Sequence, residues 1–301
     1  MLRGGGEMKS KAFNRCKAYL YLLPSILVLT VFTLYPLVKA FLMSFQEDYS
    51  IIDGSFDGIN LANYMDLFSD DVFLKSLANT SLYVVFVVPV SILLSLVLAV
   101  LINDTVRARP VFQTIYFLPY VTSVIAIGIV WSWIFNSNYG LLNYILSLFG
   151  IEAIPWLNDP HYALPALIIF SIWKSLAFNI LIFLAGLQSI SPDIYQAARI
   201  DSTPRARVFF KITVPQLRPI LVYAFLMGLI NAFKVYNEVF SLFQGDAGPA
   251  NSAITVVYYI YDKFYNSNDY GVASAAAVVL FVIILALTMI QRFVTRDKEA
   301  A

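Results

Sequence analysis

The sequence predicts an all-α integral membrane protein with six transmembrane helices. Of its 301 residues, 59% are hydrophobic and only 13% are charged, and the mean hydropathy is +0.73. A soluble domain carries about 25% charged residues, and a sphere of this size has too little interior to hide so much apolar surface. The composition therefore excludes a soluble monomer. It also excludes disordered, collagen-like and coiled-coil chains.

Six apolar stretches are each long enough to cross a bilayer as a helix, which takes roughly 20 residues. Nearly all charged residues fall between them, and the short alternating segments of a membrane β-barrel are absent. The pattern therefore predicts a helical bundle over residues 18–294, with tails at 1–17 and 295–301. The six stretches cover residues 18–44, 76–102, 111–135, 163–187, 219–243 and 271–292.

The first stretch is interpreted as a retained helix. A basic segment precedes it, as in a signal peptide, but its apolar part is too long and no small-residue cleavage site follows. Prolines lie inside several spans, and membrane helices tolerate them where neighbours re-satisfy the backbone. We expect either local kinks or simple packing at Pro24, Pro36, Pro89 and Pro119.

Basic residues are sorted along the chain, although the net charge is only +1. With the N-terminus placed inside, 15 Lys and Arg residues fall in cytoplasmic segments, and only Lys75 and Lys263 fall outside. The first external loop is rich in Asp and Glu instead. Because cytoplasmic loops carry an excess of Lys and Arg, both termini are predicted to be cytoplasmic.

Residues that support catalysis or metal binding are scarce. The chain has one histidine, His161, and one cysteine, Cys16. A single cysteine excludes an internal disulfide, and one histidine with one distant cysteine does not favour a metal site. The segment Gly6-Glu7-Met8-Lys9-Ser10 lacks the spacing of a phosphate-binding P-loop. We expect no metal or cofactor in this chain and no nucleic-acid partner, so any nucleotide-derived energy must come from another subunit.

The loop at residues 188–218 is the most informative segment between the spans. Ser191 is a favourable N-cap, Pro192 suits the first helical position, and Asp193 complements the helix dipole. Residues at helical spacing follow, which predicts a short helix. An amphipathic segment lying on the membrane surface would show the same periodicity.

A second short helix is predicted in the same loop. Pro204 biases the residue before it away from the α conformation, so the first helix should stop near Ser202. Thr203 is then expected to cap a helix that starts at Pro204. Its apolar stripe would consist of Val208, Phe209 and Ile212.

One motif in this loop has a residue spacing that resembles the motif of a known family. Gln196-Ala197-Ala198 is followed after three residues by Ser202, and after nine more by Ile212-Thr213-Val214-Pro215. This resembles the EAA loop of permease subunits of binding-protein-dependent ABC importers, whose pattern is Glu-Ala-Ala, Gly and Ile-x-Leu-Pro. The resemblance extends over nearly the whole chain, to the carbohydrate branch with the larger maltose permease subunit and to the glycerol-phosphate permeases.

The resemblance implies a fold and a set of partners. The fold would be the permease bundle of a type I ABC importer in a bacterial or archaeal cytoplasmic membrane. Partners would be a second homologous permease subunit, two cytoplasmic ATPase subunits that use ATP and Mg, and an extracytoplasmic substrate-binding protein. In that family the loop docks on the ATPase and transmits its closure to the membrane helices.

The resemblance also assigns residues to this docking. Two departures bear on it, because Gln196 lacks the charge of Glu and Ser202 lacks the freedom of Gly at positive φ. We expect coupling to persist, with the Thr203–Pro204 break restoring the turn by another route. The expected ATPase-coupling residues are Tyr195, Gln196, Ala197, Ala198, Asp201, Ser202, Ile212 and Pro215.

Three lysines lie within the spans, where each costs at least about 2.5 kcal/mol on insertion scales. Lys39 is near the outer end of its span and can snorkel. Lys174 lies near the middle of the fourth span. In the fifth span Lys234 and Glu238 are four residues apart on one helical face, so they would either neutralise each other or line a cavity.

Sugar-contacting positions of the larger maltose permease subunit fall here on seven residues, of which Lys174, Ile230 and Lys234 depart from that subunit. Sugars require donors and acceptors that match hydroxyls, together with an aromatic face. Tryptophans near span ends are more typical of membrane-interface anchors. The expected substrate path is lined by Tyr120, Ser171, Lys174, Ser175, Lys234, Asn237 and Glu238.

These patterns predict a permease subunit that translocates a carbohydrate, with a di- or oligosaccharide as first choice, and is not itself an enzyme. A glycerol-phosphate or polyol permease is the alternative, since Lys174 and Lys234 would tolerate a phosphate. An ion-gradient secondary transporter is the alternative from another class, and Glu238 is the one acid within a span available to it. An enzyme embedded in the membrane would need a catalytic constellation that the spans lack.

Overall fold

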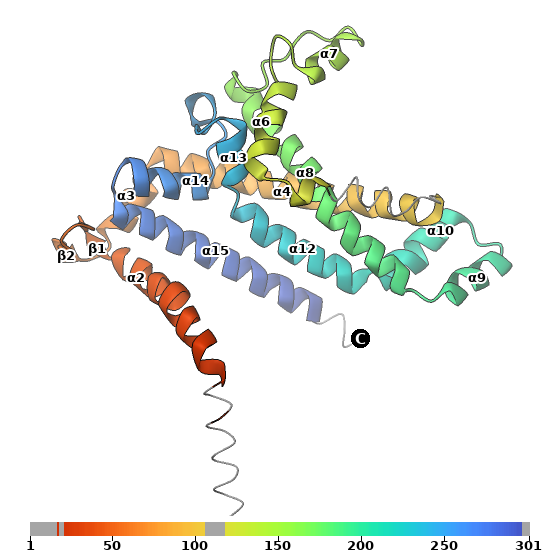
Figure 1. The fold of residues 1–301 in the computed structure, drawn as a ribbon, viewed down its shortest axis with the longest axis horizontal. Coiled ribbons are helices and arrows are strands. Elements are labelled where there is room, and N and C mark those ends of the chain that lie inside the picture. The colour runs from red at the N-terminus through yellow and green to blue at the C-terminus, as the bar shows by residue number, and fades with distance from the viewer. Residues whose placement is uncertain (1–16, 18–20, 106–117, 297–301) are drawn as a thin grey trace, which may run out of the picture.

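A computed structural model describes residues 17, 21–105 and 118–296 of this chain. Long helices α4, α12 and α15 run along the longest axis of the molecule, with α8 beside them (Figure 1). The short elements β1, β2 and α3 lie at one end of this axis, and α9 and α10 lie at the other. Of the predicted tail at 1–17 only residue 17 is described, and of the predicted tail at 295–301 only residues 295 and 296. The basic loop around 107–109 falls outside the described residues.

The N-terminal half begins with a helix over Tyr21–Met43 that contains a π-turn, η1, directly before α2. Pro36 has no N–H to donate to the carbonyl four residues earlier, which accounts for a local change of helical type here. A small antiparallel hairpin follows, with Gln46 opposite Ile59. The bounds are η1 Thr30–Leu34, α2 Tyr35–Met43, β1 Gln46–Glu47, β2 Gly58–Ile59, α3 Ala62–Ser69 and α4 Asp71–Thr105.

The rest of the chain alternates long apolar helices with short connecting ones. After residue 117 a helical stretch at 118–121 precedes α6 and α7, and α8 is the next long helix after α4. The bounds are α6 Val124–Ile134, α7 Leu141–Ser147, α8 Pro160–Ser189, α9 Pro192–Ile200, α10 Arg205–Val208, η2 Phe209–Thr213, α11 Val214–Gln216, α12 Arg218–Phe233, α13 Asn237–Leu242, η3 Pro249–Asn251, α14 Val256–Tyr261, η4 Asp262–Asn266 and α15 Tyr270–Arg296.

Four described helices are long and apolar enough to cross a membrane, which confirms four of the predicted spans: Tyr21–Met43, Asp71–Asn103, Pro160–Ser189 and Tyr270–Thr295. A fifth span is obtained if the helices Arg205–Gln216 and Arg218–Phe233, which meet at a bend of 69°, are counted as one. The expected count of six is therefore not reproduced by the described residues.

Two predicted spans differ from the structure. The span at 111–135 starts outside the described residues, and its described part leaves helical geometry at Ser123 before α6 begins. The span at 219–243 is not one helix, because α12 ends at Phe233 and α13 begins at Asn237. Apolar composition identified both segments as membrane-embedded, but composition does not reveal a break within an apolar run.

The core lies between α4 and α8, with α6, α12 and α13 packed around them. Small residues allow the closest approaches: a Cβ added at Gly128 of α6 would lie 2.1 Å from the Ser241 hydroxyl of α13, so only glycine fits there. The largest fully buried side chains are aliphatic and aromatic. They include Leu167, Phe170, Ile180, Phe183 and Leu184 of α8.

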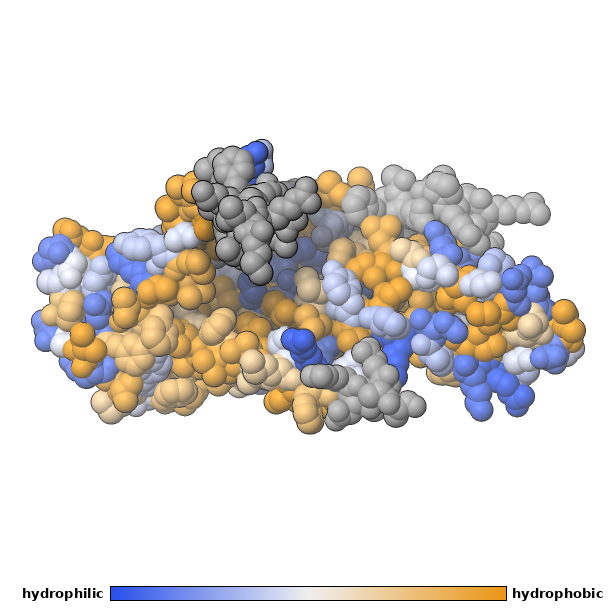
Figure 2. All heavy atoms as spheres, turned by 90° about the horizontal axis from the view of Figure 1, so that it is seen from below, coloured by the Kyte–Doolittle hydropathy of each residue, from blue (hydrophilic) through white to orange (hydrophobic). Residues whose placement is uncertain are grey.

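The surface follows the expectation for a membrane protein. Hydrophobic side chains cover much of the middle of the face seen in Figure 2, and hydrophilic ones gather toward both ends, including the end where α9 and α10 lie. The N-terminal helix diverges from the bundle in Figure 1, and only 6% of its apolar window is buried within the described chain. Lys39 on this helix is exposed, and its Nζ lies 5.8 Å from the ring centroid of Tyr49.

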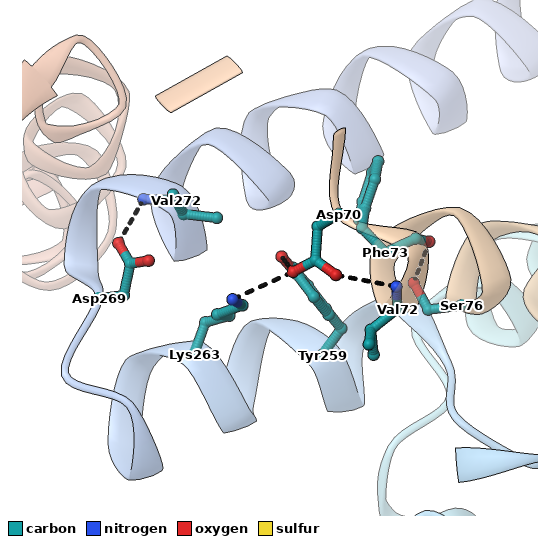
Figure 3. A network of polar contacts seen from close by, with 8 residues as sticks. All are labelled: Asp70, Val72, Phe73, Ser76, Tyr259, Lys263, Asp269 and Val272. Carbon is teal, nitrogen blue, oxygen red and sulfur yellow. Dashed lines mark hydrogen bonds and ion pairs between the residues drawn. The ribbon is translucent and has the colours of Figure 1, made fainter. Parts of the chain in front are cut away.

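A polar network joins the start of α4 to the segment before α15 (Figure 3). The Asp70 carboxylate accepts hydrogen bonds from the Tyr259 hydroxyl and the Val72 N–H, both at 2.8 Å, and pairs with Lys263 at 3.1 Å. Partial burial by itself would raise the pKa of Asp70, but its hydrogen bonds and the Lys263 charge outweigh burial and lower it. Burial and the same carboxylate raise the pKa of Tyr259, which keeps its proton.

We expect Asp70→Asn to lower the stability of the purified protein by about 1–2 kcal/mol at neutral pH, because it removes a charged acceptor from this network. A carboxyl group with a lowered pKa in the folded state stabilises the fold above its unfolded pKa of about 3.9. That stability is lost as the pH falls through the folded pKa. Thermal unfolding in detergent between pH 7 and pH 3 measures the difference.

The control is Asp66→Asn, because Asp66 is exposed on the neighbouring helix α3. Its unfolding temperature should match that of the unmodified protein throughout. A stability gap for Asp70→Asn that stays constant down to pH 3 would contradict the assignment.

Candidate functional site

The break between α12 and α13 is the main irregularity within the predicted spans. Residues 234–236 leave helical hydrogen bonding, and Tyr236 has φ −142° and ψ −55°. In hydrocarbon an unpaired carbonyl is costly, and the Val235 carbonyl is satisfied by the buried Thr255 hydroxyl at 2.8 Å. The break is therefore supported by a second segment of the chain.

An ion pair crosses from α8 to α13 beside this break. Lys174 Nζ lies 2.6 Å from Glu238 Oε1, and both side chains are about one-fifth exposed, at 21% and 18%. One of the two alternatives predicted from the sequence is that Lys234 and Glu238 neutralise each other on a continuous helix. That hypothesis is wrong, because the break removes the helical spacing and Glu238 pairs with Lys174 instead.

Lys234 and Asn237 lie on either side of the break and are both exposed. Lys234 ends α12, and its N–H donates to the Asn231 carbonyl at 3.1 Å. No salt bridge to Lys234 is present within residues 21–105 and 118–296. This lysine therefore offers an available charge close to a neutralised pair.

Three hydroxyl groups lie beside the ion pair. Ser175 donates to the Ser171 carbonyl at 2.8 Å along α8, and Ser171 is almost fully buried. Tyr83 of α4 is 3% exposed, and its hydroxyl lies within electrostatic range of Ser171 and Glu238. Tyr83 is not among the residues predicted from the sequence, where its one signal is a phenol inside a long apolar run.

An aromatic contact brings Tyr120 next to the same face of α8. Its ring stacks on Phe178 with centroids 5.3 Å apart and planes 19° apart, and Phe178 follows Lys174 by about one helical turn. Tyr120 is half exposed. The structure thus groups Ser171, Lys174, Ser175 and Glu238, with Tyr120 beside them; we call these five residues and Tyr83 the polar patch.

Tryptophans of α6 and α8 continue the aromatic lining toward the outer end. The Trp131 ring contacts those of Trp173 and Phe170 at 5.2 and 5.6 Å. Trp133 of α6 is 60% exposed. Within the described residues, no group of three or more His, Cys, Asp or Glu side chains could hold a metal ion.

The loop after α8 folds largely as predicted at its start. Ser191 accepts a hydrogen bond from the Asp193 N–H at 3.3 Å, which confirms it as the N-cap of α9. Pro192 occupies the first turn, as expected. The Tyr195 hydroxyl lies 3.3 Å from the Thr213 hydroxyl, so α9 is tied to the second part of the loop.

The end of α9 is closed by Ser202 in the left-handed conformation, with φ +51°. The Thr203 N–H donates to the Ala198 carbonyl at 2.9 Å and the Ser202 N–H to the Arg199 carbonyl at 3.0 Å. This pair of bonds is the Schellman motif, in which glycine is the usual residue at the left-handed position. The expectation that the Thr203–Pro204 break would restore the turn by another route is therefore wrong, because serine itself adopts the glycine conformation.

The second helix of the loop also differs from the prediction. It begins at Arg205, with Pro204 as its N-cap, and no side chain caps it. Thr203 does not cap this helix because it lies one residue before the N-cap position, which Pro204 occupies. The helical segment then continues through the predicted apolar stripe to Gln216.

Exposure of the predicted coupling residues is uneven. Ala198 is buried, and Tyr195 and Ile212 are half-buried, so these three hold the loop together. Ile200 is 84% exposed, which is unusual for an aliphatic residue. The exposed members of the predicted set are Gln196, Ala197, Asp201, Ser202 and Pro215.

Comparisons with known proteins place this geometry in context. Residues 91–299 match the family described as the binding-protein-dependent transport system inner membrane component. The chain is 33% identical over 281 residues to the trehalose/maltose transport system permease protein MalF of Thermococcus litoralis, covering 93% of this chain and 94% of the relative. It is 34% identical to the arabinooligosaccharides transport system permease protein AraP of Bacillus subtilis, covering 92% and 88%.

A solved structure shares the fold. It is a bacterial alginate ABC transporter in complex with an alginate pentasaccharide-bound periplasmic protein. The match has a TM-score of 0.79 and 26% identity, and it covers 95% of this chain and 96% of that one. This similarity confirms the predicted type I permease fold, whereas it does not test the individual site residues.

We expect Glu238→Gln to destabilise the protein more than the double change Lys174→Met with Glu238→Gln. The single change leaves a lysine unpaired among apolar side chains, at a cost of roughly 1–3 kcal/mol for a partly buried pair. The double change removes both charges. Thermal unfolding of the purified protein in detergent measures both variants.

Lys234→Met is the matched control, because Lys234 is exposed and outside the pair. It should shift the unfolding temperature less than Glu238→Gln does. Equal losses for the single and double variants would show that the two charges do not depend on each other.

We expect Ser202→Gly to slow amide hydrogen exchange in residues 192–201 by roughly two- to fivefold, because glycine adopts positive φ without the steric cost that serine bears. Ser202→Val should accelerate exchange there, since a β-branched residue strongly disfavours this conformation. Exchange measured by mass spectrometry reports on both.

The matched control is Asp48→Gly, a change at another left-handed position, with φ +50° and far along the chain. It should leave exchange in α9 unchanged. Slower exchange in Ser202→Val than in Ser202→Gly would refute the assigned role of this residue.

Proposed function

This chain belongs to the binding-protein-dependent transport system inner membrane component family, and from that premise we propose that it is the permease subunit of an ATP-driven importer of a di- or oligosaccharide. It is a multi-pass protein of the cytoplasmic membrane. The two relatives named above are transport proteins for sugars according to their names, and this supports a carbohydrate as the transported molecule.

The observation that carries the proposal is the polar patch within the bundle. Its one cation and one anion neutralise each other, since Lys174 and Glu238 are 2.6 Å apart. Around them lie hydroxyl groups and the face of an aromatic ring. A neutral molecule rich in hydroxyls matches this combination of donors, acceptors and ring face. An anion such as glycerol phosphate would depend on Lys234 alone, so the sugar is favoured.

The position of α9 explains how this patch would respond to an ATPase. Helix α8, which carries Lys174, leads directly into α9. The helical segment Arg205–Gln216 then bends by 69° into α12, which ends at the break before Glu238. A force on α9 therefore reaches Lys174 through α8, and it reaches the break before Glu238 through α12. Alternating access would follow from moving α8 and α12 relative to each other.

The partners are part of the proposal. A second homologous permease would complete the translocation path, and two cytoplasmic ATPase subunits would dock on the exposed face of α9, hydrolysing ATP with Mg. An extracytoplasmic binding protein would deliver the sugar to the loops at 136–162 and 242–270. A substrate-bound periplasmic protein is part of the alginate complex that shares this fold, which supports the last partner.

The ion-gradient alternative requires an acid free to change its protonation during transport. Glu238 is held by Lys174, so this acid is committed to an ion pair in the observed conformation. The geometry therefore favours energy supply through the loop over supply through a titrating side chain.

We expect Ala197→Glu to reduce sugar uptake and binding-protein-stimulated ATP hydrolysis together, by about tenfold, because it places an unpaired charge in the docking face of α9. The experiment uses proteoliposomes with the second permease, the ATPase subunits and the binding protein. Radiolabelled sugars chosen from a binding panel on the binding protein are the substrates. Uptake should require ATP and should not change when an uncoupler is added.

Ala206→Glu is the matched control, because Ala206 is an exposed alanine of α10 in the same loop. It should retain at least half of the activity. Unchanged ATP hydrolysis in Ala197→Glu would contradict docking through α9. Uptake that needs no ATP and collapses with the uncoupler would overturn the importer itself.

A further inference from the structure

Three tyrosine rings form a continuous line from the helix break toward the surface. Tyr236 lies in the break, Tyr261 ends α14 and Tyr265 lies in η4. The ring centroids of Tyr236 and Tyr261 are 5.0 Å apart, and those of Tyr261 and Tyr265 are also 5.0 Å apart. We call these three residues the tyrosine track.

The track is held in place from behind by two further rings. Tyr258 is buried, and its ring centroid lies 6.0 Å from that of Tyr236 and 6.2 Å from that of Tyr261. Its hydroxyl donates to the Gly245 carbonyl. Phe240 of α13 contacts Tyr236 at 5.6 Å. The rings of the track therefore have fixed neighbours that limit their rotation.

The track has one end at the candidate site and the other in open space. Tyr236 directly precedes Asn237 and is two residues from Glu238. Tyr265 is 66% exposed. Helices α13 and α14 lie on the side of the molecule away from α9 and toward α3, which is the predicted external side (Figure 1). The track thus leads from the external side to the break beside the polar patch.

Membrane-interface tyrosines offer a simpler explanation, since such residues form belts around many membrane proteins. Belt residues face lipid at one depth and need not touch each other. Here the three rings contact one another in sequence and come from two separate elements, and their line ends at a break in a helix. This arrangement is better explained by a ligand that moves along it.

Sugars have the chemistry for such a ligand. A tyrosine presents an apolar ring face and a polar hydroxyl, and a pyranose presents a C–H face and a rim of hydroxyls. Adjacent rings of the track are 5.0 Å apart, so neighbouring units of one sugar chain can contact different rings. No side chain of the track carries a charge, which suits a neutral saccharide.

We propose that the tyrosine track is a saccharide-binding site that guides the incoming sugar chain from the external surface to the polar patch. This inference rests on the proposed function, because it names a path for the same substrate. The track binds through stacking on each ring in turn, so it retains chains of several sugar units better than disaccharides.

The test measures sugar contact directly, by saturation-transfer NMR on the assembled complex in lipid nanodiscs without the binding protein. The probes are maltopentaose and maltose at millimolar concentration. We expect Tyr261→Ala and Tyr265→Ala each to lower saturation transfer to maltopentaose by roughly threefold. The loss for maltose should be smaller. Tyr261→Phe keeps the ring and should retain most of the signal.

Tyr35→Ala is the matched control, because Tyr35 of α2 is 63% exposed and lies outside the track and outside the loops that receive the sugar. It should leave the signal unchanged. Equal signals in Tyr261→Ala, Tyr265→Ala and the unmodified protein would overturn the proposal, as would an equal loss in Tyr35→Ala. The experiment measures binding and not import, so a failure of ATP-driven uptake would not remove the contrast between Tyr261→Ala and Tyr35→Ala.

Discussion

The ion pair between Lys174 and Glu238 is the interaction on which the arrangement of the central helices depends. In a bilayer neither charge can be left without a partner, so α8 and α13 must stay close enough to keep the two side chains together. Glu238 reaches Lys174 only because α12 stops at Phe233 and the chain restarts at Asn237. The break and the ion pair therefore require each other, and the polar patch forms where they meet.

The break itself is stable because another segment completes its hydrogen bonds. Thr255 satisfies the Val235 carbonyl, and the next residues form α14, whose aromatic side chains cover the break. Asp70 in turn holds α14 and η4 against the start of α4 through Tyr259 and Lys263. A continuous set of contacts thus runs from the external network in Figure 3 to the centre of the bundle. A substrate at the track or the patch would meet surfaces already ordered by these contacts.

Structural features that depend only on neighbouring residues could be predicted from the sequence. The capping of α9 by Ser191 followed from residue types at adjacent positions, and it was confirmed. The pairing of Lys234 with Glu238 was wrong, because spacing along the sequence has meaning only within an unbroken helix. Tyr83 was missed, since an isolated phenol in an apolar run gives no sign of which helix it faces. The role of Ser202 was also misjudged, because serine rarely adopts positive φ unless its surroundings hold it there.

The sequence by itself determined that this chain lies in a membrane, which segments are apolar enough to enter it, and to which family it belongs. These properties follow from composition and linear spacing, which survive in the unfolded chain. The tertiary structure alone decided where the fifth span breaks, which cation neutralises Glu238, and which rings line up from the surface to the site. Those outcomes depend on contacts between residues far apart in the chain, such as Lys174 with Glu238, and on backbone geometry that such contacts stabilise.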